Sequence, residues 1–270
     1  MQLDRRHILL GMVGLGITAC GAKASKAVEP VSTTGAPSSD VTTTTSTRSA
    51  NNTAATSAAT PSTTAAAAPT GPARYVNHGD ASLKRIALTF HTEGTVAQVG
   101  RLLDMAKSLD VPLTMLIVGN WLDQNRALGM RIADAGHDVG NHTYSHLSLP
   151  DQTRDVVASE IRRCATLLRD VTGNQGRWFR PSGSNSTTPL INEEAGKAGY
   201  PIVLGFDTDP LDYQDPGSTA VRSRVVSGAH AGSIVSLHAQ HQGTIDIFEA
   251  MIGALREKGF TLARASDFVS

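Results

Sequence analysis

The chain lacks an excess of charge of either sign, because 24 Lys and Arg residues balance 24 Asp and Glu residues to a formal net charge of zero. This balance gives no support to nucleic acid as a partner. Aromatic residues are scarce, and the two Trp, four Tyr and six Phe all lie at or after Tyr75. Only the last part of the chain, about 200 residues, can therefore build a core, and that length suits a single domain.

The N-terminal region lacks an apolar run long enough to span a bilayer. The apolar residues 8–17 fall short of the roughly 20 that a membrane span needs, and Arg5 and Arg6 precede them, as in an export signal. The start of the chain resembles a twin-arginine signal, and residues 17–20 resemble a bacterial lipobox that ends in a lipidated Cys20. We expect an exported protein that is lipid-anchored to the outer face of the cell membrane. If Cys20 is incidental to a plain signal peptide, the protein is secreted.

Cysteine is also scarce. If Cys20 is acylated, Cys164 has no partner for a disulfide, and its amphipathic surroundings predict a small buried hydrophobe. Residues 21–73 are rich in Thr, Ala, Ser and Pro, which predicts a disordered tether with a span of about 40 Å. The sequence is therefore divided into an export signal at 1–20, this tether, and a folded domain at 74–270.

The folded domain alternates short β-branched runs with longer amphipathic stretches. This alternation predicts an α/β fold with a parallel sheet, and its length favours a (β/α) barrel over an open doubly wound sheet. The main predicted strands are residues 86–90, 113–118, 202–206 and 233–237, and the predicted helices are 96–109, 124–135, 153–171, 189–198, 219–226 and 245–258.

In folds of this kind the chemistry gathers at the carboxyl ends of the strands. Five strand ends carry ionisable side chains, and exposure to solvent alone does not account for this pattern. His142 and His146 are spaced so that both imidazoles can bind one cation, although two surface histidines would show the same spacing. The ionisable residues at the strand ends are His91, Glu93, His142, His146, Arg180, Asp207, Asp209, Asp212, His238 and His241.

Several motifs in a fixed order resemble those of the polysaccharide deacetylase family, the NodB homology domain of carbohydrate esterase family 4. The resemblance covers roughly residues 84–268 and implies a distorted (β/α) barrel. It also implies a metal-dependent hydrolase that removes N-acetyl groups. Residues 141–146 look like the family's metal-binding His-x-x-x-His motif, 179–183 like its Arg-Pro loop, 209–213 like its Asp-x-x-Asp-aromatic motif, and 234–238 like its last strand with a catalytic His.

The first family motif is altered. The family has Thr-Phe-Asp-Asp-Gly, with a general base followed by a metal ligand, whereas residues 89–94 read Thr-Phe-His-Thr-Glu-Gly. Either His91 stands in the place of the base, or one residue is inserted and Glu93 takes the place of the ligand. We favour Glu93 as a metal ligand beside His142 and His146, with His91 in the position of the base.

The resemblance also implies roles for residues of the other motifs. His238 would protonate the leaving amine, and Asp207, Asp209 or Asp212 would orient the His238 imidazole. Arg180 would orient a carboxylate, either in the loop of Asp209 and Asp212 or on Glu93. The implied cofactor is one divalent metal ion, with zinc favoured.

The predicted function is removal of N-acetyl groups from an N-acetylglucosamine-type polysaccharide. For an anchored enzyme, cell-wall glycan is the natural substrate, and a chitin-like glycan has the same chemistry. Two alternatives stay open: a non-catalytic glycan-binding relative, and a metal-dependent amidase that acts on another C–N bond. Besides the glycan and the membrane, the sequence points to no protein partner.

Overall fold

The computed structural model describes residues 71–270, so the predicted export signal, Cys20 and nearly all of the tether lie outside the described residues. The described residues form one parallel sheet with the strand order β1-β6-β5-β4-β3-β2-β7, and β8 pairs with the start of β2. The strands are β1 (Arg74–Val76), β2 (Arg85–Thr92), β3 (Thr114–Ile117), β4 (Asp138–Asn141), β5 (Trp178–Phe179), β6 (Ile202–Leu204), β7 (Ile234–His238) and β8 (Thr261–Leu262).

The strand order has the character of a barrel. From β2 to β6 each strand lies beside the next one in sequence, so the order has no reversal point of the kind that defines a doubly wound sheet. β1 and β7 end the order, and an isolated bridge between Thr208 and Val235 joins the segment after β6 to β7. The predicted distorted (β/α) barrel is confirmed.

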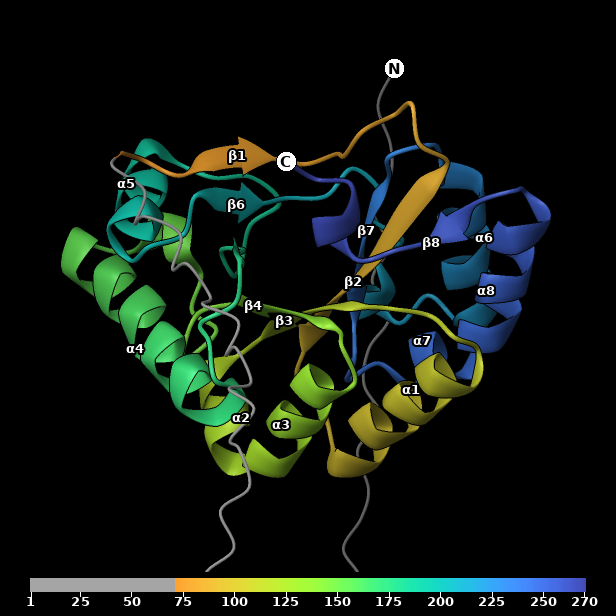
Figure 1. Cartoon of the computed structure of the whole chain (residues 1–270), viewed down its shortest axis with the longest axis horizontal. Coiled ribbons are helices and arrows are strands. Elements are labelled where there is room, and N and C mark those ends of the chain that lie inside the picture. The colour runs from red at the N-terminus through yellow and green to blue at the C-terminus, as the bar shows by residue number, and fades with distance from the viewer. Residues whose placement is uncertain (1–70) are drawn as a thin grey trace, which may run out of the picture. The chain divides into compact units, whose positions relative to one another are not determined.

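Helices surround this sheet on its outer side (Figure 1). None of the helices in the described part of the chain is both long and apolar enough to cross a bilayer. The helices are α1 (Val96–Ser108), α2 (Gly119–Gln124), α3 (Arg126–Asp134), α4 (Arg154–Thr172), α5 (Pro189–Lys197), α6 (Ser218–Gly228), α7 (Gln242–Asp246) and α8 (Phe248–Glu257), with short 3-10 turns η1 (Leu149–Asp151), η2 (Asp212–Gln214) and η3 (Ala265–Asp267).

Local sequence signals set the ends of the long helices. α1 begins with a capping box in which Thr95 Oγ1 accepts from the Gln98 backbone N–H and Gln98 Oε1 accepts from the Thr95 N–H. α4 ends at Gly173, whose φ of 82° is the left-handed conformation that glycine adopts freely. Cys164 is fully buried on the inner face of α4, as predicted, and burial raises the pKa of its thiol.

The alternation of side chains along β2 determines which residues face the inside of the barrel. Ile86, Leu88 and Phe90 pack outward into the main apolar cluster beneath the helices. Ala87 packs into the inner cluster, and the period of two places Thr89 and His91 on that same face. The inner face of β2 therefore becomes polar toward the carboxyl end of the strand, where Thr89 and His91 lie.

Some boundaries differ from the sequence-based prediction. The predicted helix 124–135 begins later, because Asn125 has non-helical dihedrals that separate α2 from α3. The predicted helix 245–258 is broken at Ile247 into α7 and α8. β1, α2 and β8 were not predicted, since two- to six-residue elements carry too short a pattern to be identified.

Candidate metal and catalytic site

The carboxyl ends of β2, β4, β5 and β7 bring most of the predicted site residues together. His91 of β2 is the register partner of His238, the last residue of β7. His142 directly follows β4, and Arg180 directly follows β5. Because parallel strands end at the same edge of a sheet, residues almost 150 positions apart in sequence become neighbours.

Three imidazoles form a group that fits one metal ion. His91, His142 and His146 each offer a ring nitrogen, and these atoms lie within 4.8 Å of one another. The Nε2 atoms of His142 and His146 are 3.2 Å apart, and the rings of His91 and His142 have centroids 4.0 Å apart. Three imidazoles are a donor set that zinc accepts with an open fourth position.

The outer nitrogens of two of these rings are held by oxygen atoms. His142 Nδ1 lies 3.0 Å from the backbone oxygen of Arg180, and His146 Nδ1 lies 2.9 Å from Glu93 Oε1. An oxygen acceptor on one ring nitrogen keeps a proton there and leaves the other nitrogen free as a ligand. This arrangement directs both Nε2 atoms into the space that the rings share.

The structure groups His91, rather than Glu93, with the two histidines of the His-x-x-x-His motif. Glu93 lies beyond the end of β2, and its carboxylate reaches the outer nitrogen of His146 instead of the shared space. The close contact with His146 lowers the pKa of Glu93, against a smaller opposing effect of burial. The roles predicted for His91 and Glu93 therefore stay predictions, and the geometry favours an exchange of their places.

Burial keeps two imidazoles of this group, those of His91 and His142, neutral. Desolvation, followed by the nearby His142 and His238 rings, lowers the pKa of His91 well below its ordinary value. Burial and the neighbouring His146 likewise lower the pKa of His142. Neutral imidazole is the form that binds a metal ion.

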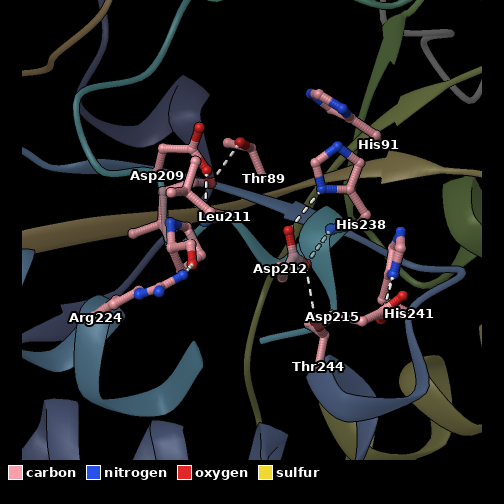
Figure 2. A network of polar contacts seen from close by, with 12 residues as sticks. Thr89, His91, Asp209, Leu211, Asp212, Asp215, Arg224, His238, His241 and Thr244 are labelled. Atoms are coloured by element: carbon pink, nitrogen blue, oxygen red, sulfur yellow. Dashed lines mark hydrogen bonds and ion pairs between the residues drawn. The ribbon is translucent and has the colours of Figure 1, made fainter. Parts of the chain in front are cut away.

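His238 forms a closely held pair with Asp212 (Figure 2). His238 Nδ1 lies 2.7 Å from Asp212 Oδ1, while Asp212 Oδ2 accepts from the His238 backbone N–H at 2.8 Å and from Thr244 Oγ1 at 2.7 Å. Burial by itself would raise the pKa of Asp212. The hydrogen bonds from His238 and Thr244 together outweigh burial, so the pKa lies below its ordinary value. Figure 2 shows the other side of the His238 ring pointing toward His91.

Arg180 does not pair with a carboxylate among the described residues, which corrects the sequence-based expectation. Its guanidinium donates to the backbone oxygens of Leu204 and Gly205, each at 2.8 Å, and to Thr89 Oγ1 at 2.9 Å. Its Nη1 also lies 3.2 Å from His91 Nε2. Burial lowers the pKa of Arg180 to about 9. Backbone oxygens of the last residue of β6 and of the residue that follows it satisfy the buried guanidinium, so Arg180 links β5, the end of β6 and β2.

Asp209 takes no part in orienting His238, which Asp212 alone holds. Asp209 Oδ1 accepts the Leu211 backbone N–H at 2.8 Å, a contact that shapes its own loop. Leu211 has a φ of 56°, and the loop turns there to present Asp212 to β7. Of the three predicted aspartates, Asp212 is the partner of His238, Asp209 lines the cavity, and Asp207 pairs with His230.

A cavity of about 580 Å³ lies in front of these groups. Gln240 lines this cavity, and its Oε1 is buried without a hydrogen-bond partner among the described residues. Tyr213 is 46% exposed, and its ring centroid lies 5.5 Å from that of His238. The cavity is lined by His91, His142, His146, Gly183, Ser184, Asn185, Phe206, Asp209, Tyr213, Ser236, His238 and Gln240.

A larger hollow of about 1110 Å³ lies at the opposite end of the strands, between α1, α3 and residues 256–262. Three of its charged groups have partners: Arg131 pairs with Asp104, and Arg256 donates to the Leu109 oxygen. His137 is there, but its Nδ1 accepts the Leu113 backbone N–H. This hollow resembles a structural junction more than a reactive site.

The sequence missed Asn185, Phe206 and Gln240 in the cavity, because no motif marks a loop residue that lines a hollow. It also missed Glu160, which is buried on α4 and accepts hydrogen bonds from the loop between His142 and His146. A signal for Glu160 was present. An acidic residue stands on the apolar stripe that Cys164 and its neighbours form along α4.

A parallel (β/α) barrel with an imidazole cluster at the carboxyl ends of its strands defines the structural class of this protein. A family model of polysaccharide deacetylase matches residues 78–203, so the resemblance to that family found in the sequence is confirmed.

Known relatives include cell-wall enzymes and a protein without activity. The peptidoglycan-N-acetylglucosamine deacetylase PgdA of Listeria monocytogenes is 29% identical over 66% of this chain and 37% of its own length. A peptidoglycan-N-acetylglucosamine deacetylase of Bacillus cereus is 25% identical over 68% of each protein. BA3943 of Bacillus anthracis, a CE4 family pseudoenzyme, has a TM-score of 0.68 at 23% identity over 73% of this chain and 69% of that one. A mutant of BA3943 has restored enzymatic activity. The chain spans little more than a third of PgdA, and its likeness to BA3943 concerns the fold.

Proposed function

We propose that the chain is a metal-dependent hydrolase that removes N-acetyl groups from an N-acetylglucosamine-type polysaccharide, with cell-wall glycan as its substrate. The observation that carries this proposal is that a group of three imidazoles and the His238–Asp212 pair share one cavity. The names of the Listeria and Bacillus cereus relatives support the choice of an N-acetylglucosamine polymer.

In this proposal His91, His142 and His146 hold one zinc ion, and Glu93 orients His146 through its outer nitrogen. The ion, when bound, would polarise the acetamide carbonyl and lower the pKa of a water molecule toward neutrality. The donor set fits, because the rings converge and burial keeps His91 and His142 neutral. This assignment exchanges the roles that the sequence favoured for His91 and Glu93.

His238 is the group that moves protons. Asp212 holds a proton on His238 Nδ1, so Nε2 is the atom that faces the cavity. Nε2 accepts a proton from the attacking water, and Asp212 stabilises the imidazolium that forms. Nε2 then donates the proton to the glycan nitrogen as its bond to the acetyl carbon breaks, because an amide anion is too poor a leaving group. One imidazole thereby serves as base and then as acid, which accounts for a site without the family's first aspartate.

The remaining groups orient the substrate. Tyr213, half exposed beside His238, offers a face on which a sugar ring can stack. Gln240 lines the same cavity, where its side chain can contact the glycan. The exported, lipid-anchored location proposed from residues 1–20 would bring this cavity to the cell wall.

A non-catalytic glycan-binding protein is the second candidate. The altered first motif at residues 91–93 favours it, and so does the fold shared with a CE4 family pseudoenzyme.

Acetate release separates the two candidates. Zinc-loaded full-length chain, incubated with peptidoglycan and with chito-oligosaccharide, should release acetate from at least one of them, and His238→Ala should lower the rate by about 10²–10⁴-fold. The matched control is His230→Ala, which removes an exposed imidazole that pairs with Asp207 outside the cavity and should leave the rate unchanged. Retained glycan binding with no acetate from either substrate would replace the proposed hydrolase with a binding protein.

A further inference from the structure

The loop that carries His142 and His146 contains an unusual backbone. Thr143 has a φ of 68° and His146 a φ of 59°, both in the left-handed region that residues with a Cβ rarely adopt. Such conformations persist only where the surrounding structure fixes them. The spacing of the two imidazoles therefore depends on contacts that hold this loop.

The first half of the loop is held by β4 and the Arg-Pro loop. Asn141 Oδ1 accepts the Thr143 backbone N–H at 2.9 Å, and Thr143 Oγ1 lies 2.9 Å from Ser182 Oγ. Asn141 is itself fixed by its Nδ2, which donates to the Ile161 backbone oxygen at 2.8 Å. These contacts secure His142, the residue between Asn141 and Thr143.

The second half of the loop is held by Glu160 of α4. Its Oε2 accepts the backbone N–H groups of Tyr144 at 3.0 Å and Ser145 at 2.6 Å, and its Oε1 accepts from Ser145 Oγ at 2.7 Å. Glu160 is only 4% exposed, and both carboxylate oxygens are committed to this loop. Ser145 directly precedes His146, so the carboxylate fixes the backbone from which the His146 imidazole projects.

We infer that Glu160 is a positioning residue, which sets the His146 imidazole against that of His142 so that both can bind one ion. The inference rests on the proposed function, because that proposal places a metal ion between these imidazoles. Glu160 touches neither the ion nor the substrate, and acts only through the backbone of residues 144–145. Without it the left-handed turn at His146 would relax, and the 3.2 Å approach of the two Nε2 atoms would be lost.

Two substitutions separate the hydrogen bonds from the charge. Glu160→Ala removes all three acceptor contacts, and should weaken zinc affinity by about 10–100-fold, the usual effect of losing an outer support of a ligand. Glu160→Gln keeps one oxygen for the two backbone N–H groups, and its amide can donate to Ser145 Oγ, so zinc affinity should stay close to that of the wild type.

The chain provides a matched control. Glu194 of α5 is also 4% exposed, and its Oε1 binds Arg154 at 2.6 Å and Lys197 at 2.8 Å, without contact to the loop. Glu194→Ala should destabilise the fold, because it leaves two cations without their buried partner. Glu194→Ala should leave zinc affinity unchanged. If Glu160 had only a structural role, Glu160→Ala would leave zinc affinity unchanged as well.

A second measurement does not depend on metal. Amide hydrogen exchange of the metal-free full-length chain should report exchange at least about tenfold faster at Tyr144 and Ser145 in Glu160→Ala, and wild-type protection in Glu160→Gln and Glu194→Ala. If Glu160→Ala does not fold, Glu160→Asp replaces it, since its carboxylate stops one methylene short of the loop and should give the same changes to a smaller degree.

The outcomes are distinct. Faster exchange and weaker zinc binding in the Ala or Asp variant, with rescue by Gln, support the inference. Wild-type exchange at Tyr144 and Ser145 in the folded Ala or Asp variant overturns it, as does unchanged zinc affinity despite faster exchange. A wild-type chain that neither binds zinc nor releases acetate overturns the proposed function instead. In that case the zinc role attributed to Glu160 is also wrong, and the exchange data still decide whether Glu160 holds the loop.

Discussion

His91 and His238 are register partners at the ends of β2 and β7, and their imidazoles meet edge to face with centroids 4.3 Å apart. The family's first motif would place an aspartate at position 91, next to a histidine at 238. Here two imidazoles lie together: Asp212 contacts the His238 ring, and Arg180 contacts the His91 ring. The chemistry that such a pair can perform differs from that of a carboxylate and an imidazole, and this difference leads to the predictions below.

The first prediction separates His91 from Glu93. His91→Ala should weaken zinc affinity by more than the roughly 10–100-fold expected for Glu93→Ala, because the first removes a ligand and the second only the partner of a ligand. Competition with a chromophoric chelator measures both affinities. A larger loss in Glu93→Ala would restore Glu93 as the ligand and His91 as the base. No loss of zinc affinity or of acetate release in either variant would give first place to the glycan-binding alternative.

The second prediction concerns Asp212. In Asp212→Asn the new amide oxygen should face the two donors now bound by Oδ2, which are the His238 backbone N–H and the Thr244 hydroxyl. The amide NH2 then faces His238 Nδ1 and forces the proton onto Nε2, so Nε2 can no longer accept one. We expect kcat to fall by about 10²–10⁴-fold while the zinc dissociation constant stays unchanged. An unchanged kcat would exclude His238 as the base.

The third prediction concerns the pH dependence of stability without metal. His91 and His142 have pKa values well below that of a free imidazole, so the unfolded chain binds more protons than the folded one at pH values below about 6.5. The free energy of unfolding should therefore fall as the pH is lowered from about 6.5, by up to about 2.7 kcal/mol per pH unit for two imidazoles. Urea titrations of the metal-free chain measure this slope, and the double variant His91→Gln, His142→Gln should reduce it. A slope equal in both proteins would mean that these imidazoles are not held neutral.

The fourth prediction concerns Cys20, which lies outside the described residues. Cys20→Ser should release the protein from membranes, because the apolar run at 8–17 is too short to retain the processed chain. Fractionation of cells that produce each form gives the result. A variant that stays with the membrane and is processed like the wild type would exclude the lipoprotein interpretation.

Much of the fold could be predicted from the sequence because its signals are local. β-branched runs and amphipathic stretches alternate from residue 86 to residue 258, and the ordered motifs placed His142, His146 and His238 at strand ends. Those residues do meet in one cavity. The convergence of strand ends is a general property of parallel sheets, so it could be inferred without coordinates.

Other relationships depend on the tertiary structure. Two partners of Arg180 are backbone oxygens at the end of β6, those of Leu204 and Gly205, and a sequence shows only side chains, so a carboxylate was expected in their place. The grouping of His91 depends on β2 continuing to Thr92, which leaves Glu93 outside the strand. The role of Glu160 depends on how deeply α4 packs against the loop after β4.

The most direct test of the central claim is the position of zinc in crystals of the loaded protein, located by anomalous scattering at the zinc absorption edge. The account predicts one zinc peak at about 2.0–2.1 Å from a nitrogen of each of His91, His142 and His146, with Glu93 on the outer nitrogen of His146. A peak bound by a Glu93 oxygen with His91 outside the coordination shell would contradict the proposed ligand set. The absence of zinc from this cavity would contradict the proposed metal-dependent function.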